Sequence, residues 1–213
     1  MDQNRAGSTS HSAARKINMP ALSMVEMQDL LAELTSGDDM RAENAIPALM
    51  DLGMEVIPAL LDLTHAADID SRWWAVRSLA ASPHTRTEDL LPLLSDSASE
   101  VRAAAALALC NHPHENAIEA LINSLADEDS LTAGLAGNAL VKIGSPSVPG
   151  LLEVMKAAPI GSRILALRAL CDIRDQRAIP IMMKSLSAES TVLQFWAQEG
   201  LERLGLNMVY IQP

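Results

Sequence analysis

The side chains best suited to hold a metal ion are few and lie in two short segments. One segment contains His84, and the other contains His112, His114 and Glu115. A metal site needs several histidine, cysteine or carboxylate ligands that converge on one point. The chain shows a single His-Glu pair, and histidine in a short loop is far more often a surface residue than a ligand. We therefore predict no metal site.

Nucleophilic chemistry has no better support. Two cysteines are too few for a disulfide framework or a four-cysteine zinc site. Cys110 and Cys171 each follow a leucine directly within an apolar segment, where thiols usually act as small hydrophobic side chains. HExxH and GxSxG motifs are absent, as is a glycine-rich phosphate loop after a strand. We predict no catalytic residues and no cofactor, and the sequence favours a binding protein over an enzyme.

The charge balance excludes further classes of partner. The 213 residues include 27 acidic and 16 basic side chains, for a net charge of −11. Nucleic acids and anionic membranes require clustered positive charge, so we expect neither as a partner. No stretch of eighteen uncharged apolar residues occurs, and two unpaired cysteines suit a reducing compartment, so we expect a cytoplasmic protein. Residues 1–20 and 206–213 are expected to be tails, the first of them disordered.

A repeat of about thirty residues dominates the rest of the chain. Leucines recur at intervals of 30 or 31 residues, at Leu49, Leu79, Leu109, Leu140, Leu170 and Leu201. An alanine lies four residues before each of them, at Ala45, Ala75, Ala105, Ala136, Ala166 and Ala197. Residues four apart lie on one face of a helix, one turn from each other. The small residue lets a neighbouring helix approach closely, and the leucine fills the space between the helices.

A second helix precedes each of these. Its apolar pair lies eighteen residues before the repeated leucine, and Pro58, Pro149 and Pro180 lie near helix starts, where proline is tolerated. Acidic turns such as 36–39, 68–71 and 127–130 supply N-caps for the second helix of each pair. The pattern predicts an all-α solenoid over residues 24–205. Its six hairpins are expected at 24–53, 54–83, 84–112, 113–144, 145–174 and 175–205.

The second helices resemble those of a known repeat family. Residues 70–79 (DSRWWAVRSL) and 100–105 (EVRAAA) are similar to HEAT-like repeats of the short-period type first described in phycobilisome lyases. The resemblance implies that the second helices line the concave face of the solenoid. It also implies that Arg72, Arg102 and Arg163 tie neighbouring turns together as a structural ladder. Members of this family include bilin lyases, a diiron hydroxylase, DNA glycosylases and plain binding scaffolds, so the fold does not define the function.

Candidate contact residues lie on the face of the second helices opposite the buried leucines. They stand two and six residues before each repeated leucine. This stripe of aromatic, aliphatic, amide and arginine side chains comprises Trp73, Arg77, Asn138, Ile164, Arg168 and Phe195. Aromatic and arginine side chains are frequent anchors of interfaces. The alternative is that Trp73, Ile164 and Phe195 pack between adjacent repeats.

Three functions remain open at this point. The first is a non-enzymatic scaffold that binds a peptide or helix of another protein in the concave groove of the solenoid. The second, implied by the resemblance, is a bilin- or tetrapyrrole-handling protein of the phycobilisome lyase type, in which Arg77 and Arg168 pair with propionates. The third is a subunit of a larger assembly, because the apolar segment 205–213 is not the polar cap that a solenoid end requires.

Overall fold

The computed structural model describes residues 21–206, and within this range it consists of helices and turns without strands. Twelve α-helices follow one another along the chain. They are α1 (Ala21–Leu34), α2 (Asp39–Asp51), α3 (Ile57–Leu63), α4 (Ile69–Ala81), α5 (Thr87–Leu90), α6 (Ser99–Asn111), α7 (Ile118–Ser124), α8 (Ser130–Ile143), α9 (Val148–Ala157), α10 (Ile160–Ile173), α11 (Ile179–Ser185) and α12 (Thr191–Arg203). The expected tails, 1–20 and 206–213, lie outside the described residues except for Leu206.

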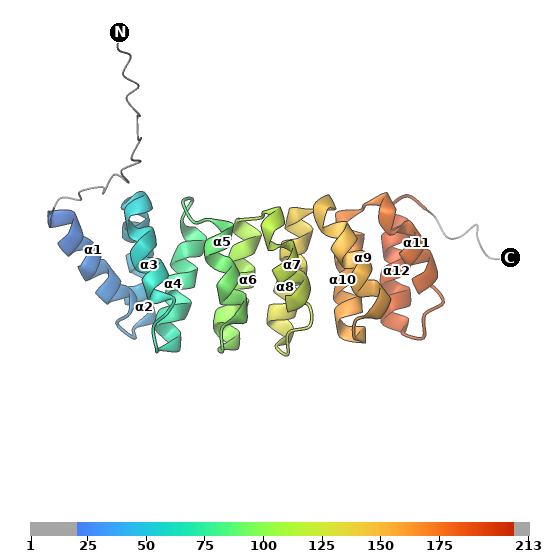
Figure 1. The fold of residues 1–213 in the computed structure, drawn as a ribbon, viewed down its shortest axis with the longest axis horizontal. Helices are drawn as coiled ribbons and strands as arrows, with labels where there is room; N and C mark the ends of the chain where they lie inside the picture. The colour runs from blue at the N-terminus through green and yellow to red at the C-terminus, as the bar shows by residue number, and fades with distance from the viewer. Residues whose placement is uncertain (1–20, 207–213) are drawn as a thin grey trace, which may run out of the picture.

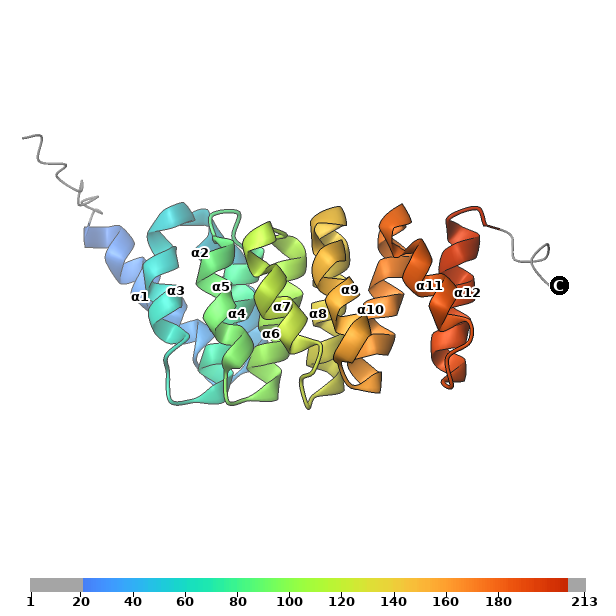
Figure 2. The ribbon, with the colours of Figure 1, turned by 45° about the vertical axis from the view of Figure 1, so that its right-hand side comes forward.

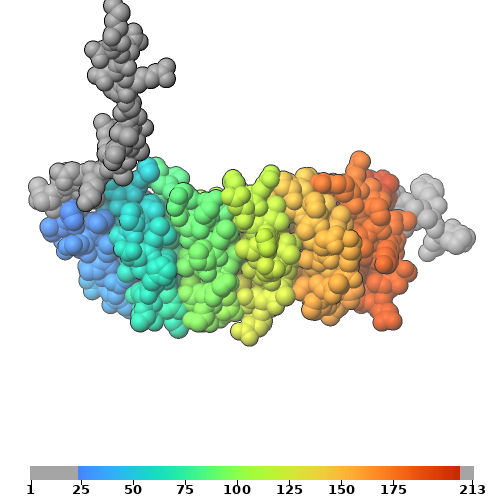
Figure 3. Space-filling model, in the orientation of Figure 1, coloured from blue at the N-terminus to red at the C-terminus, as the bar shows by residue number. Residues whose placement is uncertain are grey.

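The helices form six antiparallel hairpins stacked in a single row, from α1–α2 at one end to α11–α12 at the other (Figures 1 and 2). The even-numbered helices pack on one another along one layer, and the odd-numbered helices form the other layer. The molecule is accordingly elongated (Figure 3). The predicted all-α solenoid is confirmed.

Local signals in the sequence account for the helix boundaries. Asp38, Asp68 and Asp129 are N-caps whose carboxylates accept backbone N–H groups at the starts of α2, α4 and α8. A proline occupies the first turn of α3, α9 and α11, where the helix does not need its N–H. Each of these three helices follows a short 3-10 helix, so the chain already turns in a helical sense before the proline.

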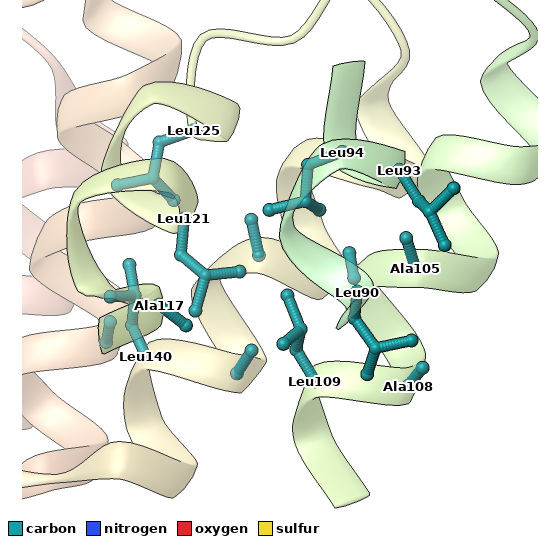
Figure 4. Packing of buried hydrophobic residues seen from close by; sticks show 14 of the residues in the cluster. Leu90, Leu93, Leu94, Ala105, Ala108, Leu109, Ala117, Leu121, Leu125 and Leu140 are labelled. Carbon is teal, nitrogen blue, oxygen red and sulfur yellow. The ribbon is translucent and has the colours of Figure 1, made fainter. Parts of the chain in front are cut away.

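The core lies between the two layers and runs the length of the row. All six repeated leucines have no exposed surface, and the alanines one turn before them are at most 4% exposed. Figure 4 shows how leucines of adjacent hairpins fill the space between helices, with Leu90 and Leu109 on one side and Leu121 on the other. No hairpin covers its apolar face by itself, so stacking creates the core.

Arginines join successive hairpins on the side of the acidic turns. Arg72 forms a two-pronged ion pair with Asp96 of the next hairpin, at 2.8 Å from both nitrogens, and Arg102 does the same with Asp127. These four side chains are only 10% exposed. Each guanidinium also donates to backbone carbonyls of its own turn. The ladder predicted at Arg72 and Arg102 is therefore present, whereas the third rung predicted at Arg163 is wrong because that arginine has no carboxylate opposite it.

Helix α12 packs tightly against α10 and α11 at Gly200. A Cβ atom built there would lie 2.5 Å from Sγ of Cys171 and 2.8 Å from Cε of Met182. Cys171 is fully buried, and its thiol donates to the carbonyl of Trp196 at 2.9 Å. The absence of a side chain at position 200 is thus what allows the last hairpin to dock.

We expect Asp127→Asn to lower the free energy of unfolding at pH 7 by about 2 kcal/mol, because it removes the charge from a hydrogen-bonded pair. Arg102 holds the pKa of the Asp127 carboxyl below its usual range through these hydrogen bonds. A lowered folded-state pKa stabilises the protein above the unfolded value of about 4, and this contribution is lost as the pH falls through the folded value. Urea unfolding of wild type and variant should therefore differ at pH 7 and converge towards pH 3. An equal difference at both pH values would contradict the ion-pair account.

We expect Gly200→Ala to destabilise the protein by about 1–3 kcal/mol through overpacking, although alanine favours helices. Gly134→Ala in α8 is the matched control, because a Cβ there meets no atom within 4 Å. The control should stabilise by about 0.5–1 kcal/mol through helix propensity alone. Thermal unfolding followed by circular dichroism measures both, and equal shifts in Tm would rule out the steric explanation.

Candidate functional site

The outer surface of the even-numbered helices contains a hollow of about 530 Å³. It extends over four helices, α2, α4, α6 and α8, and most of its lining is alanine, leucine and isoleucine. We call it the apolar groove. It is lined by Glu43, Ile46, Trp73, Arg77, Ala80, Ala81, Glu100, Ala103, Ala104, Leu107, Ala108, Asn111, Leu131 and Leu135.

The groove exists because the residues at one register position change from large to small along successive helices. The position six residues before the repeated leucine is Trp73 in α4 but Ala103 in α6 and Gly134 in α8. The tryptophan therefore forms a wall, and the small residues after it leave a floor. Leu107 and Leu131 extend over this floor and are 51% and 61% exposed. Two such leucines beside a half-buried tryptophan form a contiguous apolar surface of the kind that marks a binding site.

One wall of the groove is a fixed polar and aromatic cluster. Arg77 donates to both carboxylate oxygens of Glu43 on α2, at 2.9 and 2.7 Å. Its guanidinium carbon also lies 5.6 Å from the ring centre of Trp73, a cation–π distance. Hydrogen bonds from Arg77 lower the pKa of the Glu43 carboxyl. Arg77 is thus an oriented member of an ion pair that remains accessible, with 42% of its side chain exposed.

The other four predicted contact residues lie outside the groove. Arg168 on α10 donates to the side-chain oxygen of Asn138 on α8 at 2.7 Å, so these two residues bind each other. Ile164 is half-buried against the core. Phe195 is 58% exposed on α12 and meets Trp196 edge-on at 5.3 Å between ring centres. The structure therefore brings only Trp73 and Arg77 of the predicted stripe into the groove.

Twelve of the fourteen lining residues were not among the predicted contacts, and three of these carry the argument about the groove. Glu43 occupies the register position of Trp73 one hairpin earlier, and Leu107 occupies that of Arg77 one hairpin later. Both could have been found by extending the two register positions to every repeat. Leu131 lies nine residues before its repeated leucine, near the start of α8, where the sequence alone does not indicate which way the helix faces.

Catalytic groups are not apparent in the described part of the chain. Among residues 21–206, no three histidine, cysteine or acidic side chains lie close enough together to hold a metal ion. His84, His114 and Glu115 are exposed. Burial raises the pKa of the Cys171 thiol to about 12, and it also raises the pKa of Cys110. Neither thiol is activated as a nucleophile at neutral pH.

Two repeat families match the chain. HEAT repeats match residues 87–159, and the PBS lyase HEAT-like repeat matches residues 162–188. The chain is a HEAT-like repeat protein. Together the two matches span the chain from α5 to α11, and the expected HEAT-like repeats of the short-period type are confirmed.

Two curated relatives of this HEAT-like repeat protein come from cyanobacteria. One is a bilin biosynthesis protein, RpcF, of Synechococcus sp. strain WH8020, 32% identical over 103 residues, which are 48% of each chain. The other is a phycobilisome maturation protein of Synechococcus elongatus, 35% identical over 85 residues, which are 40% of each chain. The similarity therefore spans less than half the length of either relative.

A solved structure shares the fold of this HEAT-like repeat protein. It is the complex of CpcE and CpcF of phycocyanin lyase from Nostoc sp. PCC7120, 24% identical, with a TM-score of 0.54 over 68% of this chain and 98% of the other. At this identity the likeness concerns the helical solenoid alone. None of the helices within residues 21–206 has the length and apolar character needed to span a membrane.

Proposed function

We propose that this HEAT-like repeat protein is a scaffold that binds an apolar helix or peptide segment of another protein in the groove over α2, α4, α6 and α8. The observation that carries the proposal is the exposure of Leu107 and Leu131 in the same hollow as Trp73. An amphipathic helix or an extended segment inserts its apolar side chains into such a groove. Covering these leucines removes apolar surface from water and drives the association.

The charges around the groove favour a partner segment that has basic residues beside its apolar ones. Glu100 lies exposed at the groove and forms no ion pair within residues 21–206, and Glu43 is only partly neutralised by Arg77 at an exposed position. The whole chain carries a charge of −11. A segment with lysine or arginine beside its apolar residues would be attracted to this surface and oriented on it. Trp73, held by Arg77, supplies the rigid aromatic contact typical of interface centres.

A charge placed on the floor of the groove tests the proposal. We expect Leu131→Glu and Leu107→Glu to reduce partner capture by at least about tenfold, because a carboxylate opposes burial against an apolar segment. Affinity capture from the source organism's lysate, read by mass spectrometry, compares each variant with wild type. Binding is then measured by calorimetry with the protein captured.

Val192→Glu is the matched control. Val192 occupies the register position of Leu131 in the last hairpin, is 45% exposed, and lies outside the groove. It should leave capture unchanged, and circular dichroism should show all three variants folded. A protein captured equally by wild type and by both groove variants would place the binding surface elsewhere and overturn the proposal.

A second candidate function follows from the names of the two relatives. We propose as the alternative that the groove holds a bilin, since one relative is a bilin biosynthesis protein and the other a phycobilisome maturation protein. The hollow falls within the range of about 300–1,000 Å³ usual for small-molecule sites. Trp73 would stack against a pyrrole ring, and Arg77 would exchange its contact with Glu43 for a propionate.

An absorption titration with free phycocyanobilin tests this alternative. We expect a shifted visible band for wild type and for Val192→Glu, and a band at least about fivefold weaker at equal concentration for Leu107→Glu, because the charge disfavours an apolar chromophore. No spectral change with wild type, together with an unchanged Tm, would exclude the bilin role and leave the protein partner as the only occupant proposed.

A further inference from the structure

The turn between α11 and α12 lacks the carboxylate that the arginine ladder uses elsewhere. Asp96 and Asp127 occupy the same place in their turns, where the backbone N–H of each donates to a carbonyl three residues earlier, at 3.2 and 3.1 Å. The residue with the same backbone contact in the last hairpin is Ala188, which donates to the carbonyl of Ser185 at 3.1 Å. Alanine therefore stands where Arg163 would otherwise find its aspartate.

The rest of this turn keeps the shape of the ladder. Gln194 of α12 donates to the carbonyl of Ala188 at 2.6 Å, across six residues. Arg72 and Arg102 contact the carbonyls six residues before them in the same way. The turn thus presents the backbone that holds an aspartate in the third and fourth hairpins, and alanine takes the place of that aspartate at position 188.

Arg163 is left with a buried donor. Its Nε is enclosed, and within residues 21–206 no oxygen accepts a hydrogen bond from it. A buried N–H group without an acceptor costs roughly 1–3 kcal/mol, and a charged group costs more. At the same register position in α4 and α6, Arg72 and Arg102 are buried together with their carboxylate partners. Such an orphaned donor points to an acceptor that comes from outside the described chain.

A hollow of about 710 Å³ lies beside this donor, between α9, α10, α11 and the start of α12. Three of its lining residues are basic, Lys156, Arg163 and Lys184. Lys156 is paired with Glu153 at 2.6 Å, whereas Lys184 forms no ion pair with residues 21–206. Glu189 is the one acidic residue in the lining. A local excess of positive charge in a chain of net charge −11 selects for an anion.

We propose that Arg163 and Lys184 form a binding site for an external carboxylate, which takes the place of the aspartate missing at position 188. A planar guanidinium donates two parallel hydrogen bonds to a carboxylate, as Arg72 and Arg102 do to Asp96 and Asp127. The carboxylate belongs either to a small polycarboxylic acid or to an acidic side chain of a bound protein. The site shares no residue with the apolar groove, so it does not depend on the function proposed for that groove.

Nitrogen-proton correlation spectra of the arginine Nε–H groups report on this site directly. The Arg163 signal is assigned by its loss in Arg163→Gln. Citrate and an acetylated tetraglutamate peptide are the two probes, with sodium chloride at equal ionic strength as the reference. We expect the Arg163 signal to shift with saturation, while the signals of Arg72 and Arg102 stay in place because their acceptors are already present.

The two probes distinguish the sources of the carboxylate. A shift with citrate alone supports a small polycarboxylic acid, and a shift with the peptide supports an acidic protein segment. Lys184→Ala should raise the half-saturating concentration about threefold to fivefold, as expected for an exposed charge. An Arg163 signal that moves with neither probe, or only as it does with sodium chloride, would overturn the proposal.

Restoring the ladder supplies an independent test that does not require a ligand. We expect Ala188→Asp to raise Tm by about 2–4 °C relative to Ala188→Asn, and to abolish the probe-dependent shift of Arg163. The asparagine variant has nearly the same shape without the charge. In the Arg163→Gln background the aspartate should give no gain in Tm. If Ala188→Asp neither stabilises the protein nor blocks the probes, Arg163 does not face position 188 and the proposal fails.

Discussion

The contact between successive second helices is the constraint on which the rest of the structure depends. Alanine one turn before a fully buried leucine allows these helices to pack closely, and this pair recurs in all six hairpins. Because a single hairpin leaves an apolar face uncovered, each copy of the pair is stable only against its neighbours. The limit of close packing is reached at Gly200, where even a methyl group has no room.

With the inner face fixed in this way, the outer face of the same helices is free to vary. Stacking does not restrict the residues two, six and nine positions before each repeated leucine. In the first four hairpins the position six before the leucine changes from bulky to small residues and produces a groove, with Trp73 beside Ala103. Between the fourth and fifth hairpins Asn138 and Arg168 bind each other, and they do not line that groove. Variation on one face and repetition on the other let a single fold carry different binding surfaces.

The fold was predictable from the sequence to a greater extent than the site. The helices could be predicted because each repeat obeys the same local rules. The leucines recur every 30 or 31 residues, aspartates cap helix starts, and prolines lie in first turns. Exposure on the outer face depends on helix phase and on the size of residues in the neighbouring helix. Phe195 and Ile164 therefore matched the pattern but lie apart from Trp73, and Leu131 was missed. Arg163 shows the same limitation: its register matches Arg72, but its role depends on residue 188 in the next hairpin.

The two arginine–aspartate pairs also affect the order in which the hairpins unfold. They connect the second hairpin to the third and the third to the fourth, whereas the terminal hairpins are joined to their neighbours by the more exposed pairs Arg77–Glu43 and Arg203–Asp172. A linear array with unequal couplings opens from its weakly coupled ends, while the strongly coupled centre melts as one unit. Three of the four helices under the apolar groove belong to that centre. The walls of the groove should therefore hold their positions while the ends fray. Binding would then cost conformational entropy mainly in the incoming segment and little in this protein.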